Sequence, residues 1–120
     1  MSMLLNEEQT LLKDAAHGYF EEKMPIAAMR TLRDSQDETG FDRAAWHEMA
    51  EMGWAGVVIP EAYGGVDFGY KGLGQIMEES GHTLAATPLI STVMVSAPLV
   101  LAAGSEAQKE EILGAIAAGD

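Results

Sequence analysis

The helical patterns of this 120-residue chain are interrupted near the centre by the stretch Trp54-Ala-Gly-Val-Val-Ile-Pro60-Glu-Ala-Tyr-Gly-Gly65. Its apolar run is too short for an independent helix, and Pro60 biases the preceding residue towards an extended backbone. Gly64 and Gly65 permit a chain reversal, because glycine adopts positive φ at little cost. A single strand-like segment has no partner with which to form a sheet. We therefore predict a buried, irregular connection that neighbouring helices close over.

The composition indicates one globular domain, because 48% hydrophobic and 22% charged residues are ordinary proportions for a folded chain. Nineteen acidic against seven basic residues give a net charge of −12, which argues against binding to nucleic acid or to an anionic membrane. The chain has no cysteine, and its first residues lack the basic and apolar regions of a signal peptide. We therefore expect a cytoplasmic location and no membrane span.

Three helical patterns precede the central stretch. Asn6 and Gln9 form a capping-box pair for a helix that ends at Met24-Pro25, with an apolar face of Leu12, Ala15, Ala16, Tyr19 and Phe20. Residues 26–40 are weaker, with two possible helical turns followed by a polar loop. The next helix begins after the candidate cap Asp42 and stops at Gly53, with an inner face of Trp46, Met49 and Ala50.

Three more patterns follow the central stretch. The first runs from about Gly69 to Ser80, with Leu73, Ile76 and Met77 as its apolar face, and is expected to close at Gly81. The last begins at the capping box Ser105–Gln108. Between them, residues 87–103 begin at Thr87-Pro88 and are apolar nearly all round, apart from Ser91, Thr92, Ser96 and Pro98. We predict an all-α fold, an up-down bundle of about five helices with a buried irregular loop and no sheet.

The apolar pattern of residues 87–103 is typical of a membrane span or of the central helix of a bundle. Its length of about 25 Å is short of a hydrocarbon core of about 30 Å, and it lacks basic flanks. We therefore expect the central helix of the bundle. Pro98 removes one backbone hydrogen bond there, a defect that costs about 3 kcal/mol unless a kink and a neighbour compensate.

Two short motifs place a carboxylate three residues before a histidine, Asp14 with His17 and Glu79 with His82. This spacing occurs in carboxylate-bridged metal sites of helical bundles. However, Gly81 is expected to end its helix before His82, and no matching inward glutamates are evident on other helices. We therefore expect no metal site.

No other motif supplies catalytic machinery. His47 is expected at the surface, and the segment Gly69-Tyr-Lys-Gly72-Leu-Gly74 lacks the preceding strand and the Gly-Lys-Ser/Thr ending of a phosphate-binding loop. No serine or threonine has an evident base nearby. From the residues alone, we expect a helical bundle without catalytic or cofactor-binding residues of its own.

Several features follow one another along the whole chain: the opening amphipathic helix, Trp46, Gly53-Trp54, Pro60-Glu61-Ala-Tyr63-Gly64-Gly65, Glu78-Glu79-Ser-Gly81, the apolar helix with Pro98, and Gly104-Ser-Glu-Ala-Gln108-Lys109. Their order and spacing resemble the N-terminal α-helical domain of the acyl-CoA dehydrogenase family. The Pro-Glu-x-Tyr-Gly-Gly loop is the most specific of these features. The resemblance implies that residues 1–120 are one such domain, and that the family's β-domain and C-terminal helical domain are absent from this chain.

The resemblance implies a flavoenzyme in which a carboxylate removes the α-proton of an acyl-CoA thioester while the β-hydrogen leaves as hydride to FAD. It also implies that electron-transferring flavoprotein reoxidises the flavin, and that the complete protein forms a homo- or hetero-oligomer. The catalytic carboxylate and most flavin contacts belong to the later domains of family members. We therefore expect this fragment alone to be inactive and to bind no FAD.

The family's N-terminal domain forms one wall of the acyl pocket, on the helix that begins at Thr87. The resemblance places Thr87, Ile90, Ser91 and Met94 against the acyl chain. Plain core packing explains the spacing of these four residues equally well. The family resemblance also implies that Trp54, Ile59 and Tyr63 lie near an interface with the remaining domains. In that case the isolated domain would self-associate. An alternative is a non-catalytic bundle that binds acyl groups or partners, such as a subunit of a heteromeric dehydrogenase that lacks its own base.

Overall fold

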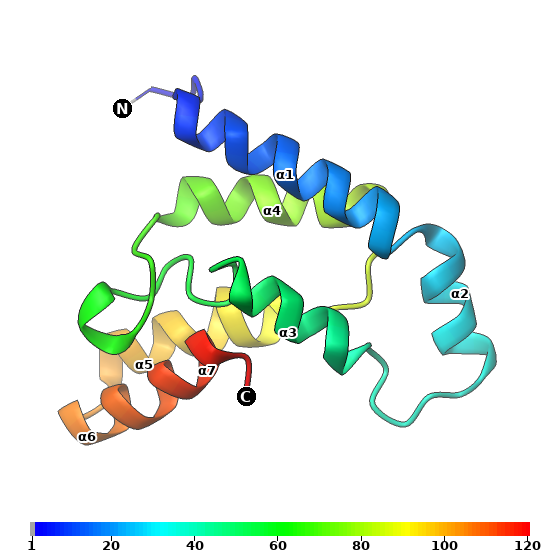
Figure 1. Ribbon diagram of the computed structural model, residues 1–120. Coiled ribbons are helices and arrows are strands. Elements are labelled where there is room, and N and C mark those ends of the chain that lie inside the picture. The colour runs from blue at the N-terminus through cyan, green and yellow to red at the C-terminus, as the bar shows by residue number, and fades with distance from the viewer. Residues whose placement is uncertain (1) are drawn as a thin grey trace.

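The computed structural model describes residues 2–120. Met1, the first residue of the segment for which we expect no signal peptide, lies outside the described residues. The helices are α1 (Glu7–Lys23), α2 (Ile26–Asp34), α3 (Arg43–Glu51), the 3₁₀ turn η1 (Glu61–Tyr63), α4 (Tyr70–His82), the π-helical η2 (Leu89–Ser96) continued by α5 (Ala97–Ala103), and α6 (Glu106–Gln108) continued by the π-helical η3 (Lys109–Leu113) and α7 (Gly114–Ala118) (Figure 1). These residues contain no strand, which confirms the all-α prediction.

The expected helix starts are confirmed by their side-chain hydrogen bonds. Asn6 and Gln9 form a complete capping box at α1, and Ser105 and Gln108 form a second one at α6. The Asp42 carboxylate accepts hydrogen bonds from two backbone N–H groups at the start of α3. These contacts are local in sequence, which is why the spacing of the residues was sufficient to predict them.

The structure differs from the expected helices in two places. The weak pattern after Pro25 does form a helix, α2, so that the described chain has six rods rather than about five. In addition, α4 continues through Gly81 to His82. A glycine inside a helix costs only about 1 kcal/mol, and the packing of Leu73 and Ile76 against the core outweighs that cost.

The rods form a slab of 41 × 36 × 20 Å, about two helix diameters thick. One side is made by α1 and α4, which lie along each other, and α3, the 89–103 rod and the 106–118 rod lie together beyond the central loop (Figure 1). The α1–α4 pair runs parallel: Lys71, at the start of α4, donates to the carbonyl groups of Ser2 and Leu4, while His17 meets Glu79 further along both helices. A slab this thin leaves most rods with one face at the surface.

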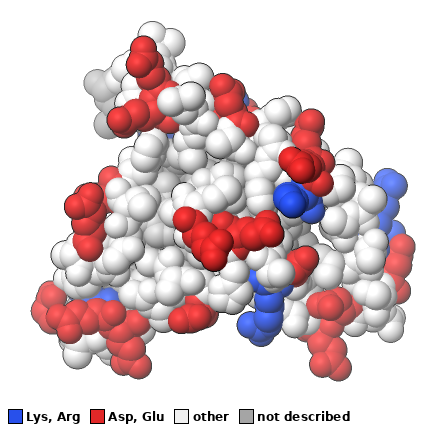
Figure 2. Space-filling model, in the orientation of Figure 1, with Lys and Arg blue, Asp and Glu red and all other residues white. Residues whose placement is uncertain are grey.

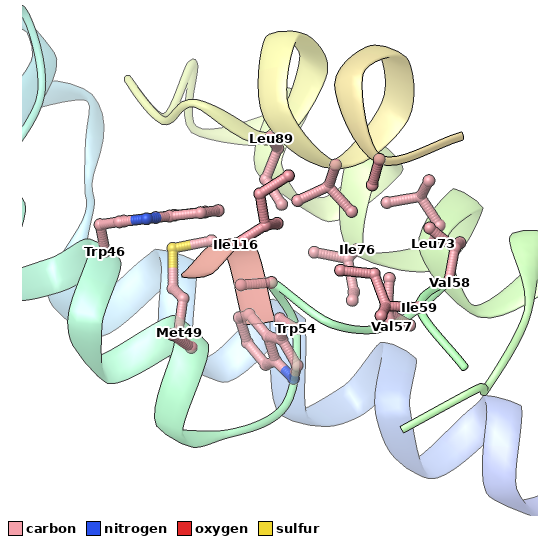
Figure 3. Close-up of a cluster of buried hydrophobic side chains, with 14 of the residues drawn as sticks. Trp46, Met49, Trp54, Val57, Val58, Ile59, Leu73, Ile76, Leu89 and Ile116 are labelled. Carbon is pink, nitrogen blue, oxygen red and sulfur yellow. The ribbon is translucent and has the colours of Figure 1, made fainter. Parts of the chain in front are cut away.

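The central stretch is buried and irregular, as the sequence predicts. Trp54, Val57 and Ile59 are almost completely buried and point into the core (Figure 3). The backbone of residues 56–59 pairs with the returning chain, because Val66 donates to Gly56, Asp67 to Ile59 and Phe68 to Val57 at 2.8–3.0 Å. The helices therefore cover the side chains of this loop, while backbone groups of Gly56, Val57 and Ile59 are paired within it.

The adjacent glycines of the loop have different roles. Gly64 has φ of +90°, the left-handed conformation expected of a reversal. Gly65 does not need positive φ, but a Cβ atom on it would overlap the carbonyl group of Ile59. The expected reversal is thus present, and the second glycine is required for close approach of two backbone segments.

The 89–103 rod is not the central helix that the sequence analysis expects. It buries one face, formed by Leu89, Val93 and Ala97 (Leu89 is labelled in Figure 3), whereas Ile90, Met94, Val95 and Leu99 are exposed. An apolar pattern on all sides does not distinguish a central helix from a surface helix with an apolar outer face. Among the described residues, no helix has both the length and the apolar character that crossing a bilayer requires.

Pro98 is accommodated by a change of helix type. Residues 89–96 wind as a π-helix, in which the N–H of Ala97 still reaches the carbonyl group of Thr92. Pro98 then lies in the first turn of α5, directly after the change of helix type. The winding change compensates for the proline, so the expected defect of about 3 kcal/mol does not arise in full.

Candidate functional site

Three of the four residues that the family resemblance singles out, Ile90, Ser91 and Met94, lie at the outer side of the 89–103 rod, and Thr87 lies just before its first residue. Ile90 is 60% exposed and Met94 is 53% exposed, Ser91 is also exposed, and Thr87 is half-buried. Leu89 and Val93 occupy the opposite, buried side. Core packing therefore does not account for Ile90, Ser91 and Met94, although their contact with an acyl chain stays a prediction.

The hydroxyl groups near this surface are engaged locally. Thr87 Oγ1 accepts a hydrogen bond from the N–H of Leu89 at 3.3 Å, although the N-cap position of η2 is occupied by Pro88 rather than by Thr87. Ser91 Oγ donates to the carbonyl oxygen of Pro88 at 3.3 Å, and Ser96 Oγ donates to that of Ser91 at 2.7 Å. These side chains support the irregular helix, and the surface they leave is mainly apolar.

A hollow of about 360 Å³ adjoins this surface between α4 and η2. Its lining consists of Tyr70, Leu73, Gly74, Met77 and Met94, none of which is charged. Residues 89–103 also carry no charge, although the chain as a whole has a net charge of −12. Acidic side chains are spread over the face shown in Figure 2, where few lysines or arginines appear. The candidate site is thus the uncharged outer side of η2 together with this hollow.

The sequence analysis missed the α4 side of the hollow. It recognised Leu73, Ile76 and Met77 as the apolar face of that helix, but Tyr70 and Gly74 also line the hollow. The signal was present as an uncharged stripe at Tyr70, Gly74 and Met77, spaced four and three residues apart. Because Gly74 has no side chain, it does not count as an apolar position, and the helical periodicity alone does not reveal this stripe.

The two carboxylate–histidine motifs meet in an unexpected way. His17 of α1 lies 2.9 Å from Glu79 of α4, measured between Nδ1 and Oε2, and its Nε2 lies 3.5 Å from Glu21. Glu79 is buried, whereas the imidazole is half-exposed. One residue of each motif thus forms a cross-helix pair, and residues 2–120 contain no group of three or more His, Cys, Asp or Glu side chains placed so that they could hold a metal ion.

The neighbouring carboxylates raise the pKa of His17 above its ordinary value of 6.5. The hydrogen bond to Glu79 is the main cause, the charge of Glu21 adds to it, Asp14 contributes least, and desolvation opposes them. The folded chain therefore favours the protonated imidazole more than the unfolded chain does, and this pair stabilises the α1–α4 contact most at low pH.

We expect this contribution to be lost as the pH rises through the raised pKa of His17. As the pH rises above 6.5, the ordinary pKa of histidine, the free energy of unfolding of the wild-type chain should fall relative to that of a His17→Gln variant. Urea titrations at several pH values measure this difference, and His47→Gln, at an exposed histidine of α3, is the control. Parallel pH profiles of wild type and His17→Gln would show that the pair contributes nothing.

The structure corrects the expectation for two of the three interface residues, Trp54 and Ile59, whereas that for Tyr63 stays a prediction. Trp54 is 3% exposed and packs edge-on against Tyr19, and Ile59 is completely buried, so both belong to the domain's own core. Tyr63 is half-buried and donates a hydrogen bond to Glu106, which lowers the pKa of that carboxyl group. Exposed apolar side chains are found instead at several other places, among them Ile90, Met94 and Val95 of η2 and Leu99 of α5.

Comparison with known proteins shows the family. A family model described as the acyl-CoA dehydrogenase N-terminal domain matches residues 6–120. This chain belongs to the acyl-CoA dehydrogenase family. The acyl-CoA dehydrogenase domain described here is 30% identical over 112 residues to acyl-CoA dehydrogenase IpdE2 of Mycolicibacterium smegmatis, a match that covers 92% of this chain and 35% of that protein. It is 28% identical over 124 residues to acyl-CoA dehydrogenase FadE26 of Mycobacterium tuberculosis, with coverage of 100% and 30%.

Solved structures share the fold of this acyl-CoA dehydrogenase domain. A variant of the Tcur3481-Tcur3483 steroid ACAD is 30% identical with a TM-score of 0.82, covering 94% of this chain and 30% of that chain. The ChsE4-ChsE5 complex from Mycobacterium tuberculosis is 24% identical with a TM-score of 0.86, covering 100% and 32%, and shows the fold alone. The chain thus spans about a third of the length of the relatives it matches.

The acyl-CoA dehydrogenase family generally uses FAD, and the described residues do not by themselves fit that cofactor. The glycine-containing segment at the start of α4 is helical, and Lys71 is held by the carbonyl groups of Ser2 and Leu4 at 2.7 and 2.6 Å. The glycine-containing segment is therefore not arranged to bind a diphosphate. The hollow beside η2 is lined by uncharged side chains and suits an apolar ligand rather than a dinucleotide.

Proposed function

We propose that residues 1–120 are the N-terminal helical domain of a longer, FAD-dependent acyl-CoA dehydrogenase, in which a β-domain and a C-terminal helical domain also occur. In this protein the outer side of η2, with Thr87, Ile90, Ser91 and Met94, forms one wall of the acyl pocket. The supporting observation is that an uncharged, largely apolar helix face is exposed on a chain with a net charge of −12. An exposed apolar face commonly marks a surface that another part of the protein or a ligand covers.

The unusual winding of the wall also supports the proposal. The eight residues of η2 form a π-helix, a rare conformation that is frequent at functional sites. Within this segment Leu89 and Val93 are buried in the core, while Ile90 and Met94 are exposed. The same segment can thus anchor the helix and present a surface to an acyl chain.

The proposed contribution of this domain is to bind the acyl chain and to exclude water from it. Oxidation of an acyl-CoA to the 2,3-enoyl-CoA removes an α-proton and a β-hydride, and a dry apolar wall prevents competing reactions at those carbons. The wall offers no base, because residues 87–103 contain neither a carboxylate nor a histidine. The catalytic base, the FAD site and the contact with electron-transferring flavoprotein are therefore assigned to the rest of the longer, cytoplasmic protein.

The direct test is to compare the complete protein with the isolated 120-residue chain. We expect the complete protein to show a flavin absorbance spectrum, which acyl-CoA bleaches under anaerobic conditions, and the isolated chain to show neither property. A complete protein that binds FAD but is not bleached by any acyl-CoA would contradict the proposed activity. Bleaching of added FAD by the isolated chain would contradict the assignment of the active site to other domains.

A second candidate is a subunit of a heteromeric dehydrogenase that lacks its own base. The observation in its favour is that the 30% identical steroid ACAD is named for two proteins, Tcur3481 and Tcur3483. Co-expression of the complete protein with acyl-CoA dehydrogenases of the same organism distinguishes the two candidates. Activity that appears only with a second, co-purifying protein supports the heteromeric subunit, and full activity of the protein alone supports the first candidate.

A further inference from the structure

We propose that residues 25–42, with α2 at their centre, form a strap that opens as one unit while the rest of the bundle stays folded, and that its opening uncovers a mainly apolar hollow. This inference goes beyond the proposed function and does not depend on it. The observation behind it concerns the attachment of α2. Among the helices of residues 2–120, α2 alone has neither a buried residue nor a hydrogen bond to another helix.

The polar contacts of α2 are all local. Its hydrogen bonds stay within residues 25–37, and its ion pair joins the neighbours Arg33 and Asp34. By contrast, the contact between His17 and Glu79 joins α1 to α4. Opening of the strap therefore breaks no hydrogen bond or ion pair between α2 and the other helices that the structure describes.

The apolar contact beneath α2 is incomplete. A hollow of about 240 Å³ lies along its inner side, and the lining also includes the charged Lys23 and Asp42. A second hollow of about 240 Å³ adjoins the first, because Met29 and Leu32 line both. Protein interiors are normally close-packed, so an interface with two hollows holds its helix weakly. The apolar lining of the first hollow includes Ala28, Met29 and Leu32 of α2 and, from other elements, Ala45, Ala85 and Ala86.

The helical form of α2 depends on this weak contact. With nine residues, α2 is shorter than the roughly 12–15 residues at which an isolated helix becomes even marginally stable in water. Its N-cap residue, Pro25, provides no side-chain hydrogen bond, and its first turn has no acidic residue. Opening therefore also breaks the helical hydrogen bonds of α2, and exchange of its amide hydrogens reports the opening directly.

The two ends of the strap are points at which the chain changes direction. Pro25 has an extended backbone between α1 and α2. At the other end, Gln36 and Gly40 have positive φ, and Asp42 then caps α3. Figure 1 shows α2 at the edge of the slab, beyond the end of α1, with a long loop that returns to α3. The strap can therefore open between two helices that stay in the core.

Opening changes the surface that precedes η2. It uncovers Ala45, which is 9% exposed in the closed state, together with Ala85 and Ala86. The last two lie directly before Thr87, where the chain leads into η2. The strap thus controls how far the apolar surface extends at this end of η2.

Hydrogen–deuterium exchange of the 120-residue chain tests the inference, with mass spectrometry at several urea concentrations below the unfolding transition. We expect the amides of α2 to exchange at least about 100-fold faster than those of α4, at a rate that depends little on urea, because a local opening exposes little surface. Leu32→Ala removes part of the contact beneath α2 and should accelerate exchange in α2 by about tenfold, with α4 unchanged. Leu11→Ala, at an exposed leucine of α1 that lines neither of these two hollows, is the matched control and should change neither helix.

Equal exchange rates in α2 and α4, with the same urea dependence, would show that α2 opens only when the whole chain unfolds, and would overturn the inference. Exchange of the α2 amides at the rate of an unfolded peptide would also overturn it, because no closed strap would then exist. A Leu32→Ala variant that accelerates both helices equally, or neither, has the same consequence. None of these outcomes affects the proposed acyl wall, which substitution of Ile90 tests separately.

Discussion

Gly65→Ala should lower the free energy of unfolding of this chain by about 3 kcal/mol or more. The expected effect is large because the added methyl group would overlap the carbonyl group and the Cβ atom of Ile59, which is itself completely buried. The backbone of the central loop cannot move away cheaply, since the N–H of Asp67 is bonded to the same carbonyl group at 3.0 Å. The substitution therefore forces the two paired segments of the loop apart.

Urea unfolding followed by tryptophan fluorescence measures this loss, because Trp54 is buried in the same loop. Gly74→Ala is the matched control: its methyl group meets nothing within 4 Å, and an alanine in a helix should stabilise by about 0.5–1 kcal/mol. A Gly65→Ala variant as stable as wild type would show that the close backbone approach at Ile59 does not hold the loop. Destabilisation by both variants would indicate a general intolerance of glycine replacement.

Ile90→Trp in the complete enzyme should lower kcat/KM for long acyl-CoA substrates by about 10- to 200-fold, and for short ones by less than about threefold. Ile90 is 60% exposed on the proposed wall, so the larger ring extends into the acyl path rather than into the core. Short chains end before they meet it, and long chains collide with it. Steady-state rates with butanoyl-, octanoyl- and palmitoyl-CoA reveal the profile.

Ile112→Trp provides the control for this substitution. Ile112 is also an exposed isoleucine in a π-helical segment, 39% exposed in η3, but it is not part of the proposed wall. Its replacement should change the three rates by less than about twofold. Equal losses for all chain lengths in Ile90→Trp would mean that the residue acts through folding or domain assembly, and would contradict its role in the acyl pocket.

Much of the fold could be predicted because its determinants are local. The cap at Asn6, the stop at Gly53 and the capping box at Ser105 each depend on residues within one or two turns, and all are present. The irregular central loop followed from Pro60 and the glycine pair in the same way. What sequence spacing did not supply was the pairing of its backbone with the returning segment at Phe68.

The arrangement of the rods could not be predicted from local patterns. His17 and Glu79 are 62 residues apart, and only the parallel packing of α1 against α4 brings them together. Similarly, the spacing of Ile90, Ser91 and Met94 fits a core face as well as a surface face. The choice between the two depends on how many helices surround the rod, and the slab leaves that side open. The family resemblance, rather than periodicity, drew attention to these residues.

The central claim is that the outer side of η2 contacts the acyl chain, and photo-crosslinking tests it most directly. The complete enzyme is irradiated with an acyl-CoA that carries a diazirine at the distal end of its acyl chain, and the labelled peptides are identified by mass spectrometry. We predict labelling at Ile90 and Met94 that excess unlabelled acyl-CoA suppresses. Labelling that is confined to other segments, such as α2, and absent from residues 87–94 would contradict the claim.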